Sequence, residues 1–197
     1  AYQNKGTALV TRKLEDRNSS LHFAPQKELG KIADLTIKNA DRNLVTSNLP
    51  TEENLFYELD QPLKAGESIQ LQLHYWVILP HKKFTEYGSA ADYVALKYFF
   101  IVPDHFDPDN ISKRSYLDME ESLNFNTHWN VQINLPKNTF AESNLEKISD
   151  NTFVGDLDTD PEFIISKQKF HSTSIHTDDI ETNIKFGYVL SASEIQN

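Results

Sequence analysis

The stretch "DQPLKAGESIQLQLHYWVILP", Asp60 to Pro80, carries the clearest strand signal in the chain. Pro62 and Gly66 indicate a turn, because proline fixes φ and glycine tolerates positive φ. After the turn, apolar residues recur at every second position: Ile69, Leu71, Leu73, Tyr75 and Val77. This period predicts a β-strand with these five side chains facing one core. We then expect Leu71→Ala to lower the free energy of unfolding by about 2–5 kcal/mol.

The same period recurs along the chain. Three further segments show it. The first places Ala33, Leu35 and Ile37 on one face, and the second places Trp129, Val131, Ile133 and Leu135 on one face. In the third, apolar residues alternate at Ile184, Phe186, Tyr188 and Leu190. Residues 93–102 are apolar on both faces apart from Lys97, which predicts a strand buried on both sides. Polar turn residues occur at 107–110, 136–138 and 158–161.

Helical signal is weak, and Ser115–Phe125 is the one segment that suggests a short helical turn. Strands at short intervals joined by polar turns favour an all-β fold, an antiparallel β-sandwich with few short helical turns. No repeat or long linker divides the chain, so we expect residues 1–197 to form a single domain.

Composition excludes several classes of protein. The chain has 197 residues and a formal net charge of −10, and an acidic surface repels the phosphates of nucleic acids. No apolar run approaches the roughly 20 residues that a membrane-spanning helix needs. The absence of cysteine excludes disulfides and thiolate metal sites. Because the sequence begins at Ala1 and its one methionine is Met119, we expect a processed protein or a piece of a longer one.

The ionisable residues form no recognisable catalytic motif. None of the seven histidines stands in H-E-x-x-H, and His171 and His176, five apart, are interpreted as solvated loop histidines rather than metal ligands. The acidic runs at 107–110 and 156–162 lack the glycine and terminal Glu of a calcium loop, so we interpret them as turns. Glu120 and Glu121 fit an exposed charged face better than an acid–base pair. The sequence therefore predicts no metal site and no catalytic residue in this chain.

Five aromatic residues lie close together between positions 93 and 106, and they could serve either as core residues or as a surface that binds a ligand. A core role is favoured over a ligand-binding shelf for Tyr93, Tyr98, Phe99, Phe100 and Phe106.

Four segments, in order, resemble one family. They are "LHFAPQKELGKIADLTIKN" from Leu21, "YELDQPLKAGESIQLQLHY" from Tyr57, "EYGSAADYVALKYFFIVPDHFD" from Glu86 and "HWNVQINLPKNTFAESNLE" from His128. Together they resemble the N-terminal, saddle-shaped β domain of the aminopeptidase N-like zinc metallopeptidases, the gluzincins. The second segment is similar to that family's Pro-Leu-x-x-Gly-Glu hairpin.

The resemblance implies a non-catalytic domain. In that family the zinc motif and the substrate loop belong to the next domain, so no cofactor is expected in this chain and zinc is expected in the missing catalytic domain. The implied partners are that catalytic domain and a peptide substrate at its cleft. Whether the parent protein is an active aminopeptidase stays open.

One position departs from the family pattern. A glutamine near the end of the cleft strand usually helps to hold the substrate's free amine, and the matching position here is Lys97. A lysine ammonium donates hydrogen bonds and repels another ammonium. Lys97 is thus the candidate substrate-cleft residue by resemblance, and its alternative role is an edge lysine with its charge in water.

Two functions follow as expectations. The first is the N-terminal domain of a gluzincin-type peptidase, and the alternative is a stand-alone β-sandwich interaction or adhesion module. A periplasmic, cell-surface or secreted location is favoured over a cytoplasmic one.

Overall fold

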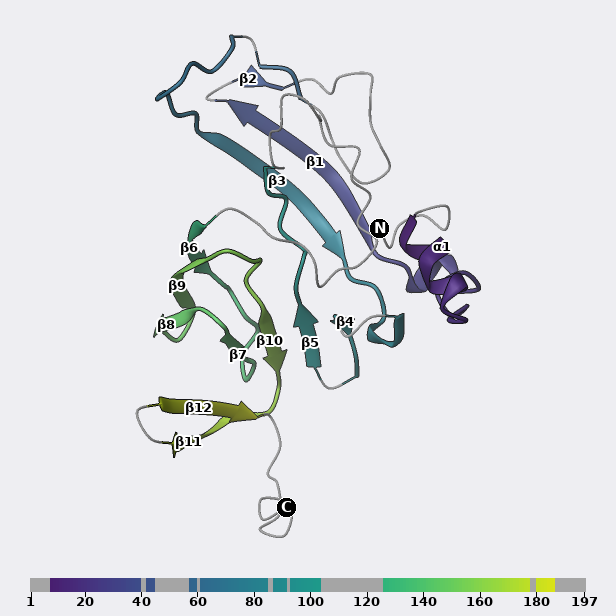
Figure 1. Ribbon diagram of the computed structural model, residues 1–197, viewed down its shortest axis with the longest axis vertical. Helices are drawn as coiled ribbons and strands as arrows, with labels where there is room; N and C mark the ends of the chain where they lie inside the picture. Colours follow the sequence, from purple (N-terminus) through teal and green to yellow (C-terminus); the bar gives the residue numbers. More distant parts are fainter. Residues whose placement is uncertain are drawn as a thin grey trace. The chain divides into compact units, whose positions relative to one another are not determined.

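A computed structural model shows that the described part of the chain is mostly β, with its strands paired antiparallel (Figure 1). The structure describes residues 8–39, 42–44, 57–59, 61–84, 87–91, 93–103, 126–177 and 180–186. The all-β class is thereby confirmed, whereas the sandwich and the saddle shape stay predictions. The helical turn predicted at 115–125, the acidic pair at 120–121 and the turn at 107–110 lie outside the described residues.

Two compact units make up the chain, and each is described by itself. The first unit comprises Ala1–Thr85 and Pro103–Ser122, and the second comprises Glu86–Val102 and Leu123–Asn197. Because compact units can be halves of one domain or separate domains, the single domain over 1–197 stays a prediction.

Where the structure describes the first unit, it contains one α-helix, two 3-10 helices and one sheet. In chain order its elements are α1 (Ala8–Glu15), the 3-10 helix η1 (Gln26–Glu28), β1 (Lys31–Asn39), β2 (Arg42–Asn43), β3 (Leu71–Ile78) and the 3-10 helix η2 (Lys82–Phe84). The sheet has the order β2-β1-β3 with antiparallel pairing.

Helix α1 was not predicted from the sequence. Its buried face carries Leu9 and Val10, and an exposed Arg12–Asp16 ion pair spans one turn. The helix ends where Arg17 adopts a φ of 62°, and the N–H of Asn18 donates to the carbonyl of Lys13 at 2.7 Å. A helix end of this kind usually carries glycine at the residue with positive φ. Because Arg17 occupies that position here, the sequence gives no glycine signal for the end of the helix.

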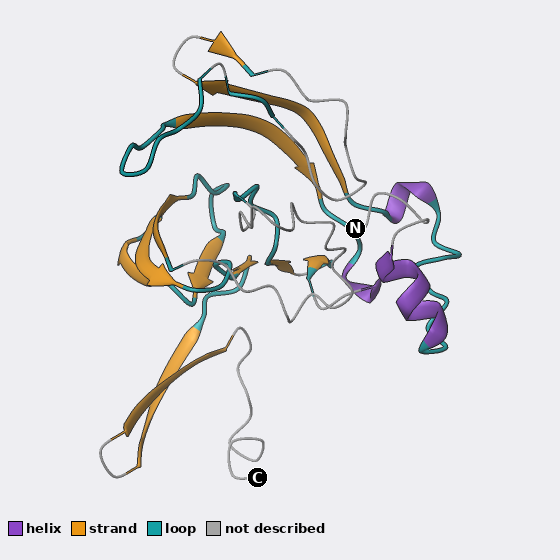
Figure 2. Cartoon of the chain, turned by 45° about the horizontal axis from the view of Figure 1, so that its top comes forward, coloured by secondary structure: helices purple, strands orange, loops and turns teal. Residues whose placement is uncertain are grey.

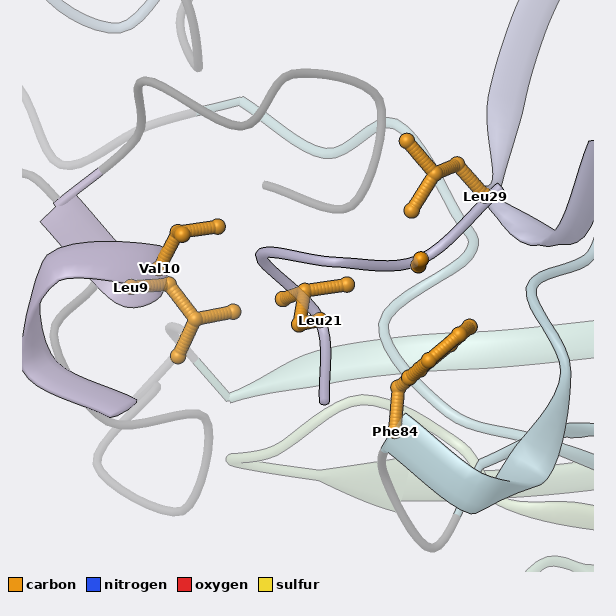
Figure 3. Packing of buried hydrophobic residues seen from close by; sticks show 6 residues of the cluster. Leu9, Val10, Leu21, Leu29 and Phe84 are labelled. Carbon is orange, nitrogen blue, oxygen red and sulfur yellow. The ribbon is translucent and has the colours of Figure 1, made fainter. Parts of the chain in front are cut away.

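Apolar side chains from both helical types form the core of the first unit (Figure 3). The cluster consists of Leu9, Val10, Leu21, Ala24, Leu29 and Phe84. Residues from α1, the following loop and η2 thus meet in one place, although they are up to 75 positions apart (84 − 9). Burial against this cluster, rather than intrinsic propensity, explains why so short a helix forms.

The predicted turn before β3 has the geometry that its residues require. The N–H of Glu67 donates to the carbonyl of Lys64 at 3.0 Å, and Gly66, the third residue of the turn, has a φ of 84°. That φ identifies a position where glycine avoids a steric cost. The Glu67 carboxylate accepts a second hydrogen bond from the N–H of Lys64 at 3.0 Å. Gly66 and Glu67 therefore each have a defined role in reversing the chain.

Strand β3 alternates as predicted, except at its first residue. Leu73, Tyr75 and Val77 are half-buried, whereas His74 and Trp76 are exposed.

Leu71 is exposed, with 39% of its surface accessible, and Ile69 lies before the strand begins. This partial exposure lowers the expected cost of Leu71→Ala below the 2–5 kcal/mol predicted from the sequence, because less apolar surface is buried there than at a core position.

A bulge in β1 changes which residues share a face. Ala33 pairs with Trp76 and Thr36 pairs with His74, so two residues of β1 lie opposite Tyr75 alone. One of these two, Asp34, has a φ of 53°. Since directly opposite residues share a face, Ala33 lies on the face of Trp76, and its predicted place beside Leu35 and Ile37 is wrong.

The described residues of the second unit form nine short strands. They are β4 (Gly88–Ser89), β5 (Tyr93–Leu96), β6 (Thr127–Gln132), β7 (Phe140–Ser143), β8 (Glu146–Ser149), β9 (Thr152–Leu157), β10 (Phe163–Ser166), β11 (His171–Thr177) and β12 (Ile180–Phe186). They form sheets of order β4-β5-β10-β7 and β6-β9-β8, and a β11–β12 hairpin. Figure 2 shows the strands of the chain in orange.

Aromatic packing dominates the core of this unit. The buried cluster consists of Ala141, Leu145, Phe153 and Phe163, and the rings of Phe153 and Phe163 meet edge to face at 5.2 Å. Partly buried residues pack against it: Leu96, Phe99, Phe100, Trp129, Val131, Ile133, Leu135, Leu157 and Ile165. The core role of Phe99 and Phe100 and the face predicted for 129–135 are thus confirmed, while Phe106 lies outside the described residues.

The strand predicted over 93–102 is shorter than expected. β5 ends at Leu96, and Tyr98 has a φ of 58°, which takes the chain out of extended conformation. Lys97 therefore stands at the end of a strand rather than in its middle, and this position defines the candidate site.

Candidate functional site

Lys97 is the one site residue proposed from the sequence, and it lies beside the start of β10. Leu96 pairs with Phe163 in the antiparallel register of β5 and β10. Extending this register by one residue places Lys97 opposite Glu162. The two side chains form an ion pair between Nζ and Oε1. Because 65 positions (162 − 97) separate these residues, their contact depends on the sheet and not on local sequence.

Two tyrosine rings enclose the ammonium group of Lys97. Nζ lies 5.4 Å from the ring centroid of Tyr87 and 5.1 Å from that of Tyr98. The rings themselves meet edge to face at 5.9 Å. Only 15% of the Lys97 side chain is accessible, against 41% for Glu162. Lys97 is therefore a largely buried cation held by a carboxylate and two aromatic faces, rather than an edge lysine with its charge in water.

The electrostatics keep Lys97 protonated. Burial alone would lower the pKa of the ammonium, but the hydrogen bonds with Glu162 and Tyr87 outweigh it, and the pKa is raised above its ordinary value. Burial also raises the pKa of the Tyr98 hydroxyl. At neutral pH the site thus contains a charged amine beside the neutral phenol of Tyr98. This amine can donate hydrogen bonds and balance charge, but it has no free electron pair for nucleophilic attack or proton abstraction.

The acidic run 156–162 is more than a plain turn. Glu162 pairs with Lys97, Asp160 is 4% accessible, and Asp156 lies on β9 directly opposite His128 of β6. His128 Nδ1 and Asp156 Oδ1 are 2.8 Å apart, on side chains that are both exposed. Such an exposed pair contributes little to stability. The sequence missed both pairings, because each requires knowing which strands are neighbours.

A second charged group lies on β7 of the same unit. The Glu142 carboxylate accepts hydrogen bonds from Lys147 at 3.2 Å and from Lys185 at 2.6 Å. Burial alone would raise the pKa of Glu142, but the two lysines outweigh it, and the pKa lies below its ordinary 4.5. Glu142 therefore joins β7, β8 and β12 through charged hydrogen bonds.

Histidines 171 and 176 lie on a strand and not in a loop. Both belong to β11, where every residue is exposed, and their odd spacing puts them on opposite faces. In the part of the chain that the structure describes, no three His, Asp or Glu side chains gather in a way that could hold a metal ion.

No helix in the described ranges is both long and apolar enough to cross a membrane. Comparisons of the chain with protein-family models, with curated proteins and with solved structures found no match.

Proposed function

We propose that this chain is a non-catalytic β module that packs against a separate domain, and that this domain is the catalytic domain of an aminopeptidase-like zinc metallopeptidase. The proposal rests on the resemblance of four ordered segments to the N-terminal β domain of that family. In this role the chain borders the cleft that binds a peptide substrate, and zinc is held by the catalytic domain. A zinc-dependent aminopeptidase activity of the parent protein is part of this proposal.

The observation that best supports a packing role is the exposed face of the β1–β3 pair. Trp76 is 64% accessible and Ile78 is 52% accessible, and both lie on the face that also carries Ala33 and His74. His74 and Trp76 meet edge to face at 6.5 Å. Aromatic residues such as tryptophan are enriched at protein interfaces, and exposed apolar side chains that share one face of a sheet are typical of such a surface.

The turn at 64–67 adds support from geometry. Gly66 and Glu67, two of the four residues that match the Pro-Leu-x-x-Gly-Glu pattern, supply the φ and the side-chain hydrogen bond of the turn. A turn built this way fixes the start of β3 and hence the face that Trp76 occupies.

The experiment has two stages. The complete reading frame is determined first, and the proposal expects H-E-x-x-H, followed by a more distant Glu, in the domain after this one. Trp76→Ser is then introduced into the complete protein, and limited proteolysis and thermal unfolding report the packing between domains. We expect Trp76→Ser to make the two domains unfold separately, because it removes the apolar anchor of the interface.

Ile148→Ser is the matched control, since Ile148 is 60% accessible but lies on β8. We expect it to leave the coupling between domains intact. A complete reading frame without a zinc motif would contradict the proposal. So would turnover of aminoacyl anilides by the 197-residue chain alone, abolished by a chelator and restored by zinc.

The second candidate function is a stand-alone β-sandwich interaction or adhesion module. It is favoured by the β11–β12 hairpin, in which every residue of β11 is exposed. A reading frame that continues into another β-rich domain, or that ends, would support this alternative.

A further inference from the structure

The β11–β12 hairpin has two chemically different faces. The register puts Thr173 opposite Ile184 and Ile175 opposite Thr182 on one face. The other face pairs Ser172 with Lys185, Ser174 with Asn183, and His176 with Glu181. Ile175 is 50% accessible and Ile184 is 40% accessible, so the apolar face is open.

The β11–β12 hairpin is a two-stranded sheet. Isolated hairpins are marginally stable in water, and strands that expose an unpaired edge tend to acquire another strand. In the described chain β11 and β12 form a sheet of two strands, with no third strand beside β12. The hydrogen bond from Lys185 to Glu142, 2.6 Å long, connects the hairpin to β7.

The charges of β12 are complementary to those of a second, antiparallel copy of the same strand. Glu181, Asn183 and Lys185 follow one another on the polar face, with a negative group at one end and a positive group at the other. If two copies of β12 pair antiparallel about Asn183, each Glu181 lies opposite the Lys185 of the other copy. Opposite charges in direct cross-strand pairs stabilise a sheet, and the wrong register would bring like charges together.

The apolar face fits the same arrangement. In this register Ile184 lies opposite Thr182 of the other copy and diagonally next to the other Ile184. Diagonal neighbours in a sheet are within reach of branched side chains. The two Ile184 side chains therefore meet at the two-fold axis, and Ile175 extends this apolar row on each side.

β11 does not have this property. Reversing it about Ser174 puts Ser172 opposite His176 and Thr173 opposite Ile175, which gives no pair of opposite fixed charges. The charge pattern thus selects one edge of the hairpin.

We propose that β12 is a homodimerisation edge, through which two copies of this chain join their hairpins into one continuous four-stranded sheet of order β11-β12-β12-β11. The occupant of this edge is a second copy related by a two-fold axis, the commonest symmetry of soluble oligomers. Lys185 takes part without leaving Glu142, because an ammonium group has three donors and 41% of this side chain is accessible. The proposal does not depend on the packing role proposed first, for which the exposed face of the β1–β3 pair is the best supporting observation.

Charge reversal tests the register directly. Sedimentation of the 197-residue chain over a concentration series is expected to show a monomer–dimer equilibrium. Glu181→Lys puts two lysines opposite each other in both pairs, and Lys185→Glu does the same with two glutamates. Each is expected to raise the dimer dissociation constant by at least about tenfold, because like charges directly opposite destabilise a sheet.

Mixing the two variants separates this register from general damage. A Glu181→Lys chain carries two lysines and a Lys185→Glu chain carries two glutamates, so the mixture is expected to form a heterodimer at the concentration where each alone is monomeric. The double variant Glu181→Lys/Lys185→Glu is expected to regain the homodimer. Circular dichroism and thermal melts of each variant check that the chain is folded.

Two controls isolate β12 from other effects. Glu146→Lys makes the same charge change on an exposed residue of β8 and is expected to leave dimerisation unchanged. Glu142→Gln removes the partner of Lys185 within the chain without changing β12, and it is also expected to leave the dimer in place.

A crosslink tests the position of the axis. The chain contains no cysteine, so Asn183→Cys introduces a single thiol at the point where the two copies meet. Mild oxidation is expected to give a covalent dimer with Asn183→Cys and little with Ser172→Cys, which lies on the other strand. A wild-type chain that is monomeric at high micromolar concentration, or single variants that dimerise as well as wild type, would overturn the proposal. A mixture that stays monomeric would overturn it as well.

Discussion

The β6–β9 pair and the β11–β12 pair are similar in sequence pattern and opposite in environment. Both are antiparallel, with six and seven residue pairs in register, and one strand of each pair, β6 or β12, alternates between an apolar and a polar face. The apolar face of β6–β9, which carries Trp129, Val131 and Phe153, packs against Phe163 of β10 and against Phe100. Every residue of β11 is exposed. Alternation therefore predicts a strand and its apolar face, whereas the covering of that face depends on elements elsewhere in the chain.

The largest expected difference between the two pairs is in their cores. Phe153→Ala removes a ring that is fully buried and touches Phe163, and we expect the free energy of unfolding to fall by about 3–5 kcal/mol. Ile175→Ala in the hairpin is expected to cost less than about 1 kcal/mol. Urea unfolding of both variants measures the difference. Equal losses would mean that the hairpin is covered in solution, and a loss that grows with protein concentration would point to the dimer.

We expect the next largest change in the free energy of unfolding at the Lys97–Glu162 ion pair, which lies where the end of β5 meets the start of β10. Glu162→Gln leaves a largely buried ammonium without its counter-charge, and we expect a loss of about 1–3 kcal/mol. Lys97→Met removes the charge but keeps an apolar stem between Tyr87 and Tyr98, so a smaller loss is expected. Thermal melts of the two variants should rank them in this order. The reverse order would show that the ammonium itself stabilises the strand ends.

Strand β3 repeats the comparison within one element. Leu73 is half-buried and Leu71 is exposed, so Leu73→Ala is expected to cost about 1–2 kcal/mol and Leu71→Ala less than about 1 kcal/mol. Both substitutions remove the same atoms, which makes each the control for the other. Urea midpoints measured side by side will reveal whether Leu71 is covered by something outside the described residues.

The smallest effect concerns the anchor of the hairpin. Because the pKa of Glu142 is lowered in the folded chain, its ionised form contributes stability above its unfolded pKa, near 4.5, and this contribution is lost as the pH falls through the folded value. Glu142→Gln is expected to lower stability by about 1 kcal/mol or less at pH 7 and by nothing at a pH below both values. Melting temperatures between pH 7 and pH 2 would contradict this if the two proteins differed by the same amount throughout.

The sequence was most informative where structure is local. The turn at 64–67 and the alternation of β3 and β6 follow from residues within a few positions of one another, and all are confirmed. The bulge at Asp34 could not be foreseen, because bulges with positive φ usually carry glycine. Helix α1 was missed because its stability comes from Phe84 and Leu21, which are distant in sequence.

The candidate site shows the same limit more strongly. Lys97 was selected from the sequence, but its partners Tyr87 and Glu162 depend on the pairing of β5 with β10. The strand predicted over ten residues, 93–102, ends at Leu96, because Tyr98 has a positive φ. No residue type in "ALKYFF" indicates such a conformation. Local sequence therefore identified Lys97 as a candidate site residue, but it could not predict which groups surround its ammonium.

The bulge in β1 has a consequence for how this chain tolerates insertions and deletions. Deleting one residue from a regular strand moves every side chain beyond it to the opposite face. In β1 one residue is already in excess, because Asp34 and Leu35 together face Tyr75. Loss of Asp34 would leave Ala33 beside Trp76 and Ile37 beside Leu73, with Leu35 opposite Tyr75. The middle of this strand is thus a place where chain length can change by one residue while the pairing on both sides is retained.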